Sequence, residues 1–355
     1  MPAIVVDAHQ DIAYNALCFG RDYRRSVYET RRVETAEIVA EAGIATLGLP
    51  NAILGRVAVT FATLFTSQVT KQPSPWDSLR YKTPQEAYQR AMLQLDYYNR
   101  LADQTDQVVL IQTQADLDKV LASWEDGSTQ HKQGLVMLME NADPIIEPRQ
   151  FEEWYGRGVR LVGPAWGATR YAGGTSQPGP LTDLGRELLD VMASFNAILD
   201  LSHLAEAAYL EAVDRYPGVI IASHSNPRRF CNTDRHLSDE MIRRLAERDG
   251  VMGIVAYNRF LSNSWKKGDR KSDLPLSIYL DAIDYVCQVT GSAAHVGIGT
   301  DLDGGFGAES TPDGIDTVTD LWHIGDKLAE RGYSPADVEA ILSGNMLRKL
   351  RQALP

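Results

Sequence analysis

Short apolar runs rich in valine and isoleucine recur along the chain, with segments of helical periodicity between them. Polar residues do not alternate with apolar ones inside these runs, which is typical of strands buried on both faces. We expect eight such strands, and a further run at 108–112 leaves the count open by one. The eight runs lie at 3–8, 57–65, 134–139, 159–163, 197–201, 218–223, 250–256 and 295–299.

The intervening segments predict helices at 84–103, 183–195, 204–214, 237–248, 276–289 and 335–343. In the first of these, Pro84 suits the opening turn. The residues expected near one another on that helix are Ala87, Ala91, Leu93 and Leu95. Strands that alternate with helices form parallel sheets. Eight such units predict a (β/α)8 TIM barrel, an α/β fold, as a single domain over residues 1–355.

Two segments without periodicity, 66–83 and 258–275, follow the second and seventh predicted strands. On a barrel both would lie at the C-terminal ends of the strands, where they could form lids or plain surface loops. The second segment contains a basic run, which suits a solvated loop or a lid that attracts an anionic substrate. The run consists of Lys266, Lys267, Arg270 and Lys271.

Imidazole and acidic side chains stand where five of the predicted strands end. They are His9, Asp11, Glu140, His203, His224 and Asp301. A histidine beside an apolar run is more often a hydrogen-bonded core residue, but the C-terminal ends of barrel strands converge on one mouth. Three histidines with a bridging and a terminal acid can hold two zinc ions, which activate a water molecule. A further carboxylate, for which Asp301 is the candidate, can then shuttle the proton to the leaving nitrogen.

Composition narrows the class of protein. The formal net charge of −12 over 355 residues argues against a nucleic-acid partner, which needs a basic surface. Cys18, Cys231 and Cys287 are odd in number and lack metal or redox spacing, so a reducing compartment is expected. The first residues lack the features of a signal peptide, and no apolar run reaches the roughly 18 residues of a membrane span. We expect a cytoplasmic protein without a membrane partner.

Seven short blocks occur in order along nearly the whole chain. They are DAHQD at 7–11, ME at 139–140, DLSH at 200–203, SHSNPRRFCNTDRHLSDEMI at 223–242, GVMGI at 250–254, HVGIGTDLDG at 295–304 and GNMLR at 344–348. In these blocks the chain resembles the membrane dipeptidase family (renal dipeptidase-like, peptidase family M19) of the amidohydrolase superfamily. The resemblance implies a zinc-dependent dipeptidase that hydrolyses small dipeptides with a metal-activated water, and a possible homodimer.

The resemblance also implies roles for individual residues. His9 and Asp11 would bind one zinc ion, His203 and His224 the other, and Glu140 would bridge the two. Asp301 would be the acid/base. Arg235 would hold the terminal carboxylate of the substrate, with Arg228 and Arg229 as rivals, and Tyr257 would line the substrate site. Asp7 is expected to support the site at the first strand, and Asp303 either supports it or forms a turn. The histidines expected to bind no metal are His131, His236, His295 and His323.

The sequence departs from the family's pattern at two places that concern substrate binding. The family carries a histidine after the fourth strand, and Gly163-Pro164 stands in its place here. Asn141-Ala142-Asp143 replaces the Gly-Gly-His that usually follows the bridging glutamate. The missing donor could be replaced by Trp166, Arg170 or Tyr171, or these residues could simply pack the loop. Two alternatives therefore stay open: a related hydrolase of another N-acyl amino acid or small amide, and a non-catalytic metal-binding barrel.

Overall fold

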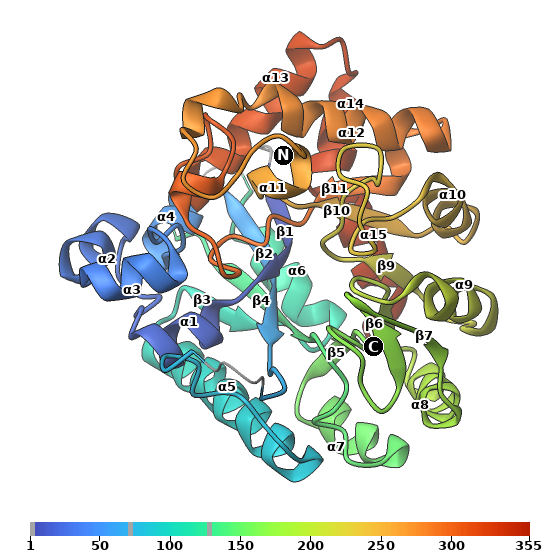
Figure 1. The fold of residues 1–355 in the computed structure, drawn as a ribbon. Helices are drawn as coiled ribbons and strands as arrows, with labels where there is room; N and C mark the ends of the chain where they lie inside the picture. Colours follow the sequence, from blue (N-terminus) through green and yellow to red (C-terminus); the bar gives the residue numbers. More distant parts are fainter. Residues whose placement is uncertain (1–3, 70–73, 126–129) are drawn as a thin grey trace.

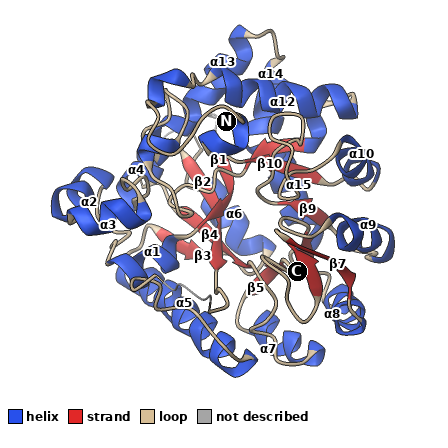
Figure 2. Cartoon of the chain, in the orientation of Figure 1, coloured by secondary structure: helices blue, strands red, loops and turns tan. Residues whose placement is uncertain are grey.

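A closed barrel of parallel strands occupies the centre of the protein, surrounded by helices (Figures 1 and 2). The structure is a computed structural model that describes residues 4–69, 74–125 and 130–355. Hydrogen bonds join the strands in the order β2-β1-β11-β10-β9-β8-β5-β4, and β4 pairs with β2 to close the ring. From the first to the eighth, the barrel strands are β1 (Val5–Gln10), β2 (Val57–Leu64), β4 (Gln133–Met139), β5 (Val159–Val162), β8 (Ile198–Asp200), β9 (Ile220–Ala222), β10 (Val251–Ile254) and β11 (Val296–Ile298).

These eight strands coincide with the eight predicted runs, so the predicted (β/α)8 barrel is confirmed; residue 3 of the first run lies outside the described residues. The further apolar run forms β3 (Val108–Leu110), which pairs with Gln133–Leu135 of β4. It extends the sheet without entering the ring, because β5 occupies the same side of β4 further along, at Met137–Met139. An antiparallel hairpin, β6 (Ala172–Gly174) and β7 (Gln177–Leu181), follows the fourth barrel strand.

The helices surround the strands in Figure 2, except α6, which is seen through the middle of the ring. They are α1 (Ile12–Phe19), α2 (Val27–Val33), α3 (Ala36–Ala42), α4 (Leu49–Leu54), α5 (Pro84–Gln104), α6 (Gln114–Ala122), α7 (Phe151–Gly156), α8 (Asp183–Ser194), α9 (Glu206–Arg215), α10 (Asp239–Glu247), α11 (Asn258–Leu261), α12 (Ser277–Thr290), α13 (His323–Glu330), α14 (Pro335–Glu339) and α15 (Asn345–Ala353). All six predicted helices are present, although α14 passes into a π-helical turn at Ala340–Gly344. Every helix within the described ranges is too short or too polar to span a lipid bilayer.

The longest helix, α5, begins as the sequence predicts, but one of the four residues expected near one another lies on a different face of the helix. Pro84 opens the helix, and Thr83 caps it by accepting a hydrogen bond from the backbone of Glu86. The side chains of Ala87, Ala91 and Leu95 are buried, whereas Leu93 is 45% exposed. Two residues along a helix turn the side chain by about 200°, so Leu93 points away from the face that holds Ala91.

The two segments predicted to be irregular are mostly loop. In the first, an isolated bridge joins Gln68 to Tyr81, while residues 70–73 lie outside the described residues. The second contains the single turn α11 and a short 3-10 turn at Lys271–Asp273. In the basic run, the exposed Arg270 donates to Asp273 at 2.8 Å, and Lys271 lies 3.8 Å from Asp316. Arg270 therefore pairs within its own loop, whereas the partly buried Lys271 reaches the loop that contains Asp316. The role of either segment as a lid stays a prediction.

Two glycines let the sixth, seventh and eighth barrel strands approach closely. A Cβ atom on Gly253, in β10, would lie 2.0 Å from the carbonyl oxygen of Ser223, and one on Gly299, after β11, would lie 1.9 Å from the same oxygen. Neither position can hold a side chain without moving this backbone. Ser223 directly precedes His224, so the close packing also fixes the start of a loop that carries a candidate site residue.

We expect Gly253→Ala to lower the free energy of unfolding by about 1–3 kcal/mol, because the new methyl group must displace the backbone at Ser223. Urea unfolding followed by circular dichroism measures this change. The matched control is Gly156→Ala at the end of α7, where a Cβ atom meets nothing within 4 Å. A Gly253→Ala protein as stable as this control would contradict the interpretation.

Candidate functional site

The six side chains predicted from the strand ends meet at the C-terminal mouth of the barrel. His9 is in β1 and Asp11 follows it; Glu140 directly follows β4. His203, His224 and Asp301 lie two or three residues beyond the ends of β8, β9 and β11. The barrel thus brings together residues that are almost 300 positions apart in the sequence.

Glu140 lies at the centre of this cluster. Its Oε2 is 3.5 Å from Nε2 of His9, while its Oε1 is 3.3 Å from Nε2 of His203 and 3.5 Å from Nε2 of His224. The two oxygens therefore face different imidazoles, although the rings of His9 and His224 stack with 3.5 Å between ring centres. Burial raises the pKa of Glu140, but the charge of His9 and hydrogen bonds from His203 and His224 outweigh it and hold the pKa well below its usual range. A carboxylate with this surrounding can bridge two cations.

Two more carboxylates lie on the His9 side. Asp301 Oδ1 is 3.8 Å from Nε2 of His9, and ligand atoms of His9, Asp11 and Asp301 all fall within 4.8 Å of one another. A second such group consists of His9, Glu140 and His224. Burial raises the pKa of both Asp11 and Asp301, although Asp301 keeps 14% of its side chain exposed. This exposed carboxylate can reach a molecule that enters the mouth.

The charges and unpaired atoms of the cluster fit metal ions. Burying carboxylates together is costly unless cations compensate them. Burial lowers the pKa of His9, but the charge of Glu140 overrides this effect and raises it, so the cluster demands positive charge. Within the described residues, both ring nitrogens of His9 and Oε2 of Glu140 are buried without a hydrogen-bond partner. Imidazole nitrogens and carboxylate oxygens are the donors that zinc accepts.

Hydrogen bonds orient His224. The Ser223 hydroxyl donates to Oδ2 of Asp200 at 2.5 Å and lies 2.8 Å from Nδ1 of His224. Because this hydroxyl already donates, it can accept from Nδ1–H, and Nε2, which lies 2.9 Å from Nε2 of His203, is the nitrogen that faces the cluster. Neither Asp200 nor Ser223 is among the site residues predicted from the sequence, although the motif DLSH places Asp200 at a strand end.

His203 is oriented in a similar way by Thr175, whose Oγ1 lies 2.9 Å from Nδ1 of the ring. Burial and the nearby charge of Arg235 lower the pKa of His203 to about 3, and burial lowers that of His224 well below its usual value. Both imidazoles are therefore neutral, which is the form that binds a metal. Thr175 follows the last residue of β6, far from any strand-end pattern, and no sequence signal identified it.

Two further carboxylates anchor the loop after β11, which carries Asp301. Asp7 accepts hydrogen bonds from the backbone and hydroxyl of Thr300 at 2.8 and 2.5 Å, and so ties β1 to the loop that carries Asp301. Asp303 accepts from the backbone and hydroxyl of Thr46 at 2.8 and 2.6 Å. Both residues are therefore positioned to support the loop that carries Asp301. Thr63 donates a short hydrogen bond to Asp11, a contact that the sequence analysis also missed.

Arg235 is the one arginine of its segment that points into the mouth. Its side chain is buried, with Nη2 donating to the backbone oxygen of His224 at 2.7 Å and Nη1 to Ser225 at 3.3 Å. Its Nε is buried without a partner among the described residues, and the guanidinium lies 5.6 Å from the ring centre of Phe260. Part of its hydrogen-bonding capacity therefore remains for a ligand.

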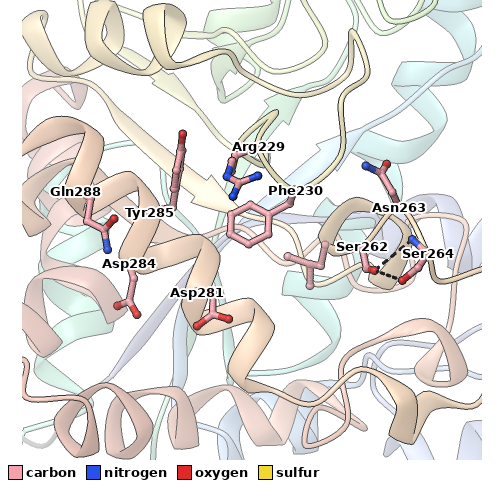
Figure 3. A pocket seen from close by; sticks show the side chains of 10 residues that line it. Arg229, Phe230, Ser262, Asn263, Ser264, Asp281, Asp284, Tyr285 and Gln288 are labelled. Atoms are coloured by element: carbon pink, nitrogen blue, oxygen red, sulfur yellow. Dashed lines mark hydrogen bonds between the residues drawn. The ribbon is translucent and has the colours of Figure 1, made fainter.

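The rival arginines lie elsewhere. Arg228 donates to Glu206 at 2.9 Å and to the backbone oxygen of His236 at 3.2 Å. Arg229 is exposed and lines a separate cavity of about 610 Å³, between its own loop and α12. Figure 3 shows it beside Phe230, with the acidic residues of α12 across the cavity. Neither guanidinium faces the cluster of histidines and carboxylates.

Tyr257 is half-buried at the end of the seventh barrel strand. Its ring stacks on Phe306 with 4.4 Å between ring centres and meets Phe260 edge-on at 5.1 Å. Phe260 also lies against Arg235, so Tyr257 belongs to the wall on that side of the mouth. Its part in substrate binding stays a prediction.

Of the three candidates for the missing fourth-strand donor, only Trp166 lies beside the cluster. Its ring centre is 5.8 Å from that of His203. Arg170 donates to the backbone oxygens of Ile145 and Ile146, and Tyr171 is buried with its hydroxyl bonded to Ile145. Arg170 and Tyr171 thus pack the loop.

The remaining histidines make contacts outside the cluster. His131 stacks on Trp124, and His323 is an exposed neighbour of Asp326. His236 bonds to Thr233 at 2.6 Å and His295 to the backbone of Gly250 at 3.0 Å. The three cysteines are free.

The sequence pattern of the membrane dipeptidase family, peptidase family M19, matches residues 2–354. The chain is 31% identical over 214 residues to a Klebsiella pneumoniae protein named "Uncharacterized protein in pqqA 5'region", a match that covers 58% of this chain and 76% of that one. Two solved structures share the fold. The probable dipeptidase PvdM from Pseudomonas aeruginosa has a TM-score of 0.79 at 20% identity, covering 99% of this chain and 96% of its own.

The second structure is a metallo peptidase from Rhodobacter sphaeroides liganded with a phosphinate mimic of the dipeptide L-Ala-D-Ala. Its TM-score is 0.78 at 21% identity, and the match covers 99% of each chain. At these identities the two structures support the barrel fold. The family pattern, which spans nearly the whole chain, shows more: this protein belongs to the membrane dipeptidase family and is a metallo-dipeptidase, a hydrolase.

Proposed function

We propose that the protein is a zinc-dependent dipeptidase that hydrolyses small dipeptides with a free terminal carboxylate. The observation that carries the proposal is the position of Glu140, with each of its oxygens facing different histidines. His9 and Asp11 would hold one zinc ion, His203 and His224 the other, and Glu140 would bridge them. When bound, two zinc ions supply Lewis acidity for the scissile carbonyl and lower the pKa of water at the site.

Asp301 would move the proton. Its carboxylate is the most exposed of the three in the cluster, and burial raises its pKa, which favours accepting a proton during the reaction. It takes the proton from the attacking water and passes it to the leaving nitrogen. Arg235, with an unpartnered Nε, would hold the terminal carboxylate of the substrate, since a guanidinium fork suits a carboxylate.

A second candidate is hydrolysis of another N-acyl amino acid or small amide at the same centre. Gly163-Pro164 at the end of the fourth barrel strand favours it, because the family's histidine is absent from the position that faces the substrate. Assays of N-acyl amino acids beside dipeptides distinguish the two. The homodimer, the cytoplasmic location and the single domain over residues 1–355 stay predictions.

We expect Asp301→Asn to reduce kcat by about 10²–10⁴-fold, because an amide cannot accept the proton. Asparagine is chosen because the backbone at Asp301 has φ 59°, which asparagine tolerates better than alanine. Steady-state hydrolysis of Ala-Ala and metal analysis by mass spectrometry measure rate and loading. The control Asp326→Asn, on the exposed face of α13, should match the wild type. A metal-loaded Asp301→Asn protein with full activity would rule out the proton shuttle.

We expect Arg235→Lys to raise KM for Ala-Ala at least about tenfold while changing KM for Ala-Ala amide much less, because only the former carries the carboxylate that the fork binds. The matched control is Arg228→Lys, seven residues earlier and paired with Glu206. Equal effects of Arg235→Lys on both substrates would contradict the assignment.

Removal of metal with a chelator should abolish turnover and lower Tm, since the carboxylates of the cluster then lose their compensating charge. Zinc added back should restore both, with close to two ions bound per chain. Glu140→Gln should bind zinc more weakly. Full activity in a protein shown to be free of metal would refute the proposed function.

A further inference from the structure

A small cavity opens beside the histidine cluster, on the side where the chain departs from its family. Its volume is about 90 Å³, and Trp166 and Asn141 are among the residues that line it. The ring of Trp166 lies 5.8 Å from that of His203, and Asn141 directly follows Glu140. Two of the residues that line the cavity therefore lie beside residues of the cluster, Trp166 in space and Asn141 in sequence.

The order of the strands places this cavity across the mouth from Arg235. Its walls come from the loops after the second, third and fourth barrel strands, β2, β4 and β5. Arg235 and Tyr257 follow the sixth and seventh strands, β9 and β10. The strands run in this order around the closed ring, as Figure 1 shows. A dipeptide held by its carboxylate at Arg235, with its peptide bond at the cluster, extends its amino-terminal residue towards the cavity.

The cavity offers a ligand apolar surface, although several of its lining residues are polar. Tyr81 donates to Asp143 at 2.6 Å, Thr169 to the backbone of Pro164 at 2.7 Å, and Asn141 to the Thr66 hydroxyl at 3.0 Å. Gln177 accepts from the backbone of Ala168 at 2.8 Å. These polar groups are therefore already paired within the protein. Trp166, which is 42% exposed and meets Phe65 at 5.4 Å, presents its ring to the mouth.

The charge and size of the cavity further restrict which side chain it can bind. Every residue that lines the cavity is uncharged, so a charged side chain would lose its hydration there without gaining a partner. The cavity volume of about 90 Å³ is small, which suits an aliphatic side chain better than an indole.

Asp143 holds the two walls of the cavity together. This buried carboxylate accepts from Tyr81 of the loop after β2 and from the backbone of Arg170, in the loop after β5, at 3.2 Å. It belongs to the Asn141-Ala142-Asp143 segment that replaces the family's Gly-Gly-His. The segment thus forms part of the wall of the cavity.

We infer that the cavity lined by Trp166 and Asn141 binds the side chain of the substrate's amino-terminal residue and selects uncharged aliphatic side chains such as leucine. This inference rests on the proposed dipeptidase function and names its substrate class.

The test compares kcat/KM of the zinc-loaded protein for Leu-Ala, Gly-Ala, Asp-Ala and Lys-Ala. We expect Leu-Ala to exceed each of the others by about tenfold or more, the discrimination that an apolar pocket gives for a few methylene groups. In Trp166→Ala the ratio of Leu-Ala to Gly-Ala should fall towards one. Trp322→Ala is the matched control, because this tryptophan is 37% exposed, similar to Trp166, and lies at the start of α13, outside the site. It should keep the wild-type ratio.

Calorimetric binding of Leu-Ala and Gly-Ala to the zinc-loaded Asp301→Asn protein separates the subsite from the reaction. If the wild type hydrolyses no dipeptide, the proposed function is wrong. The ratio of the affinities for Leu-Ala and Gly-Ala still tests the subsite in that case. If Trp166→Ala leaves the ratio of Leu-Ala to Gly-Ala unchanged, the subsite proposal is wrong. It is also wrong if the protein turns over Asp-Ala or Lys-Ala as fast as Leu-Ala. If no dipeptide binds, both proposals fail.

Discussion

The burial of several carboxylates close together is the constraint on which this site depends. Asp11, Glu140 and Asp301 converge on one barrel mouth, where the raised pKa of His9 records how strongly they attract a positive charge. A protein gains nothing in stability from such a cluster, because removing carboxylates from water costs free energy. The arrangement makes physical sense as a cage for cations, and the neutral state of His203 and His224 agrees with that use.

A metal site of this kind requires that its ligands are held rigidly. Three successive sets of contacts in the barrel hold them. Backbone hydrogen bonds between parallel strands fix the strand ends. The close contact of Gly253 and Gly299 with the backbone of Ser223 then sets the start of the loop with His224. Finally, the Asp200–Ser223 pair and Thr175 each present a ring with one nitrogen facing Glu140. Each set restricts the next, so small side-chain hydrogen bonds determine the orientation of the imidazoles.

The mouth divides into two halves of different character. On one side, Arg235 provides a buried charge with unused hydrogen-bonding capacity, suited to a carboxylate. On the other, the loops after the second, third and fourth strands present Trp166 and polar groups already paired with one another. The centre between the halves holds the histidines and carboxylates, whereas the second half is built from loop residues outside that cluster. Substrate selection can therefore change while the reaction centre stays the same.

The sequence by itself determined the barrel and the membership of the site. Apolar runs fixed the eight strands because both faces of a parallel barrel strand are buried, and the strand ends pointed to His9, Asp11, Glu140, His203, His224 and Asp301 because such ends converge. Tertiary structure decided what no local pattern contains. It distinguished Arg235 from Arg228 and Arg229, because only the path of the loop decides which of them faces the mouth. It also placed β3 outside the ring, because β5 occupies the position beside β4. It also brought Thr175 to His203 and Trp166 to the mouth. These contacts join loops far apart in sequence, and their geometry exists only once the barrel has closed.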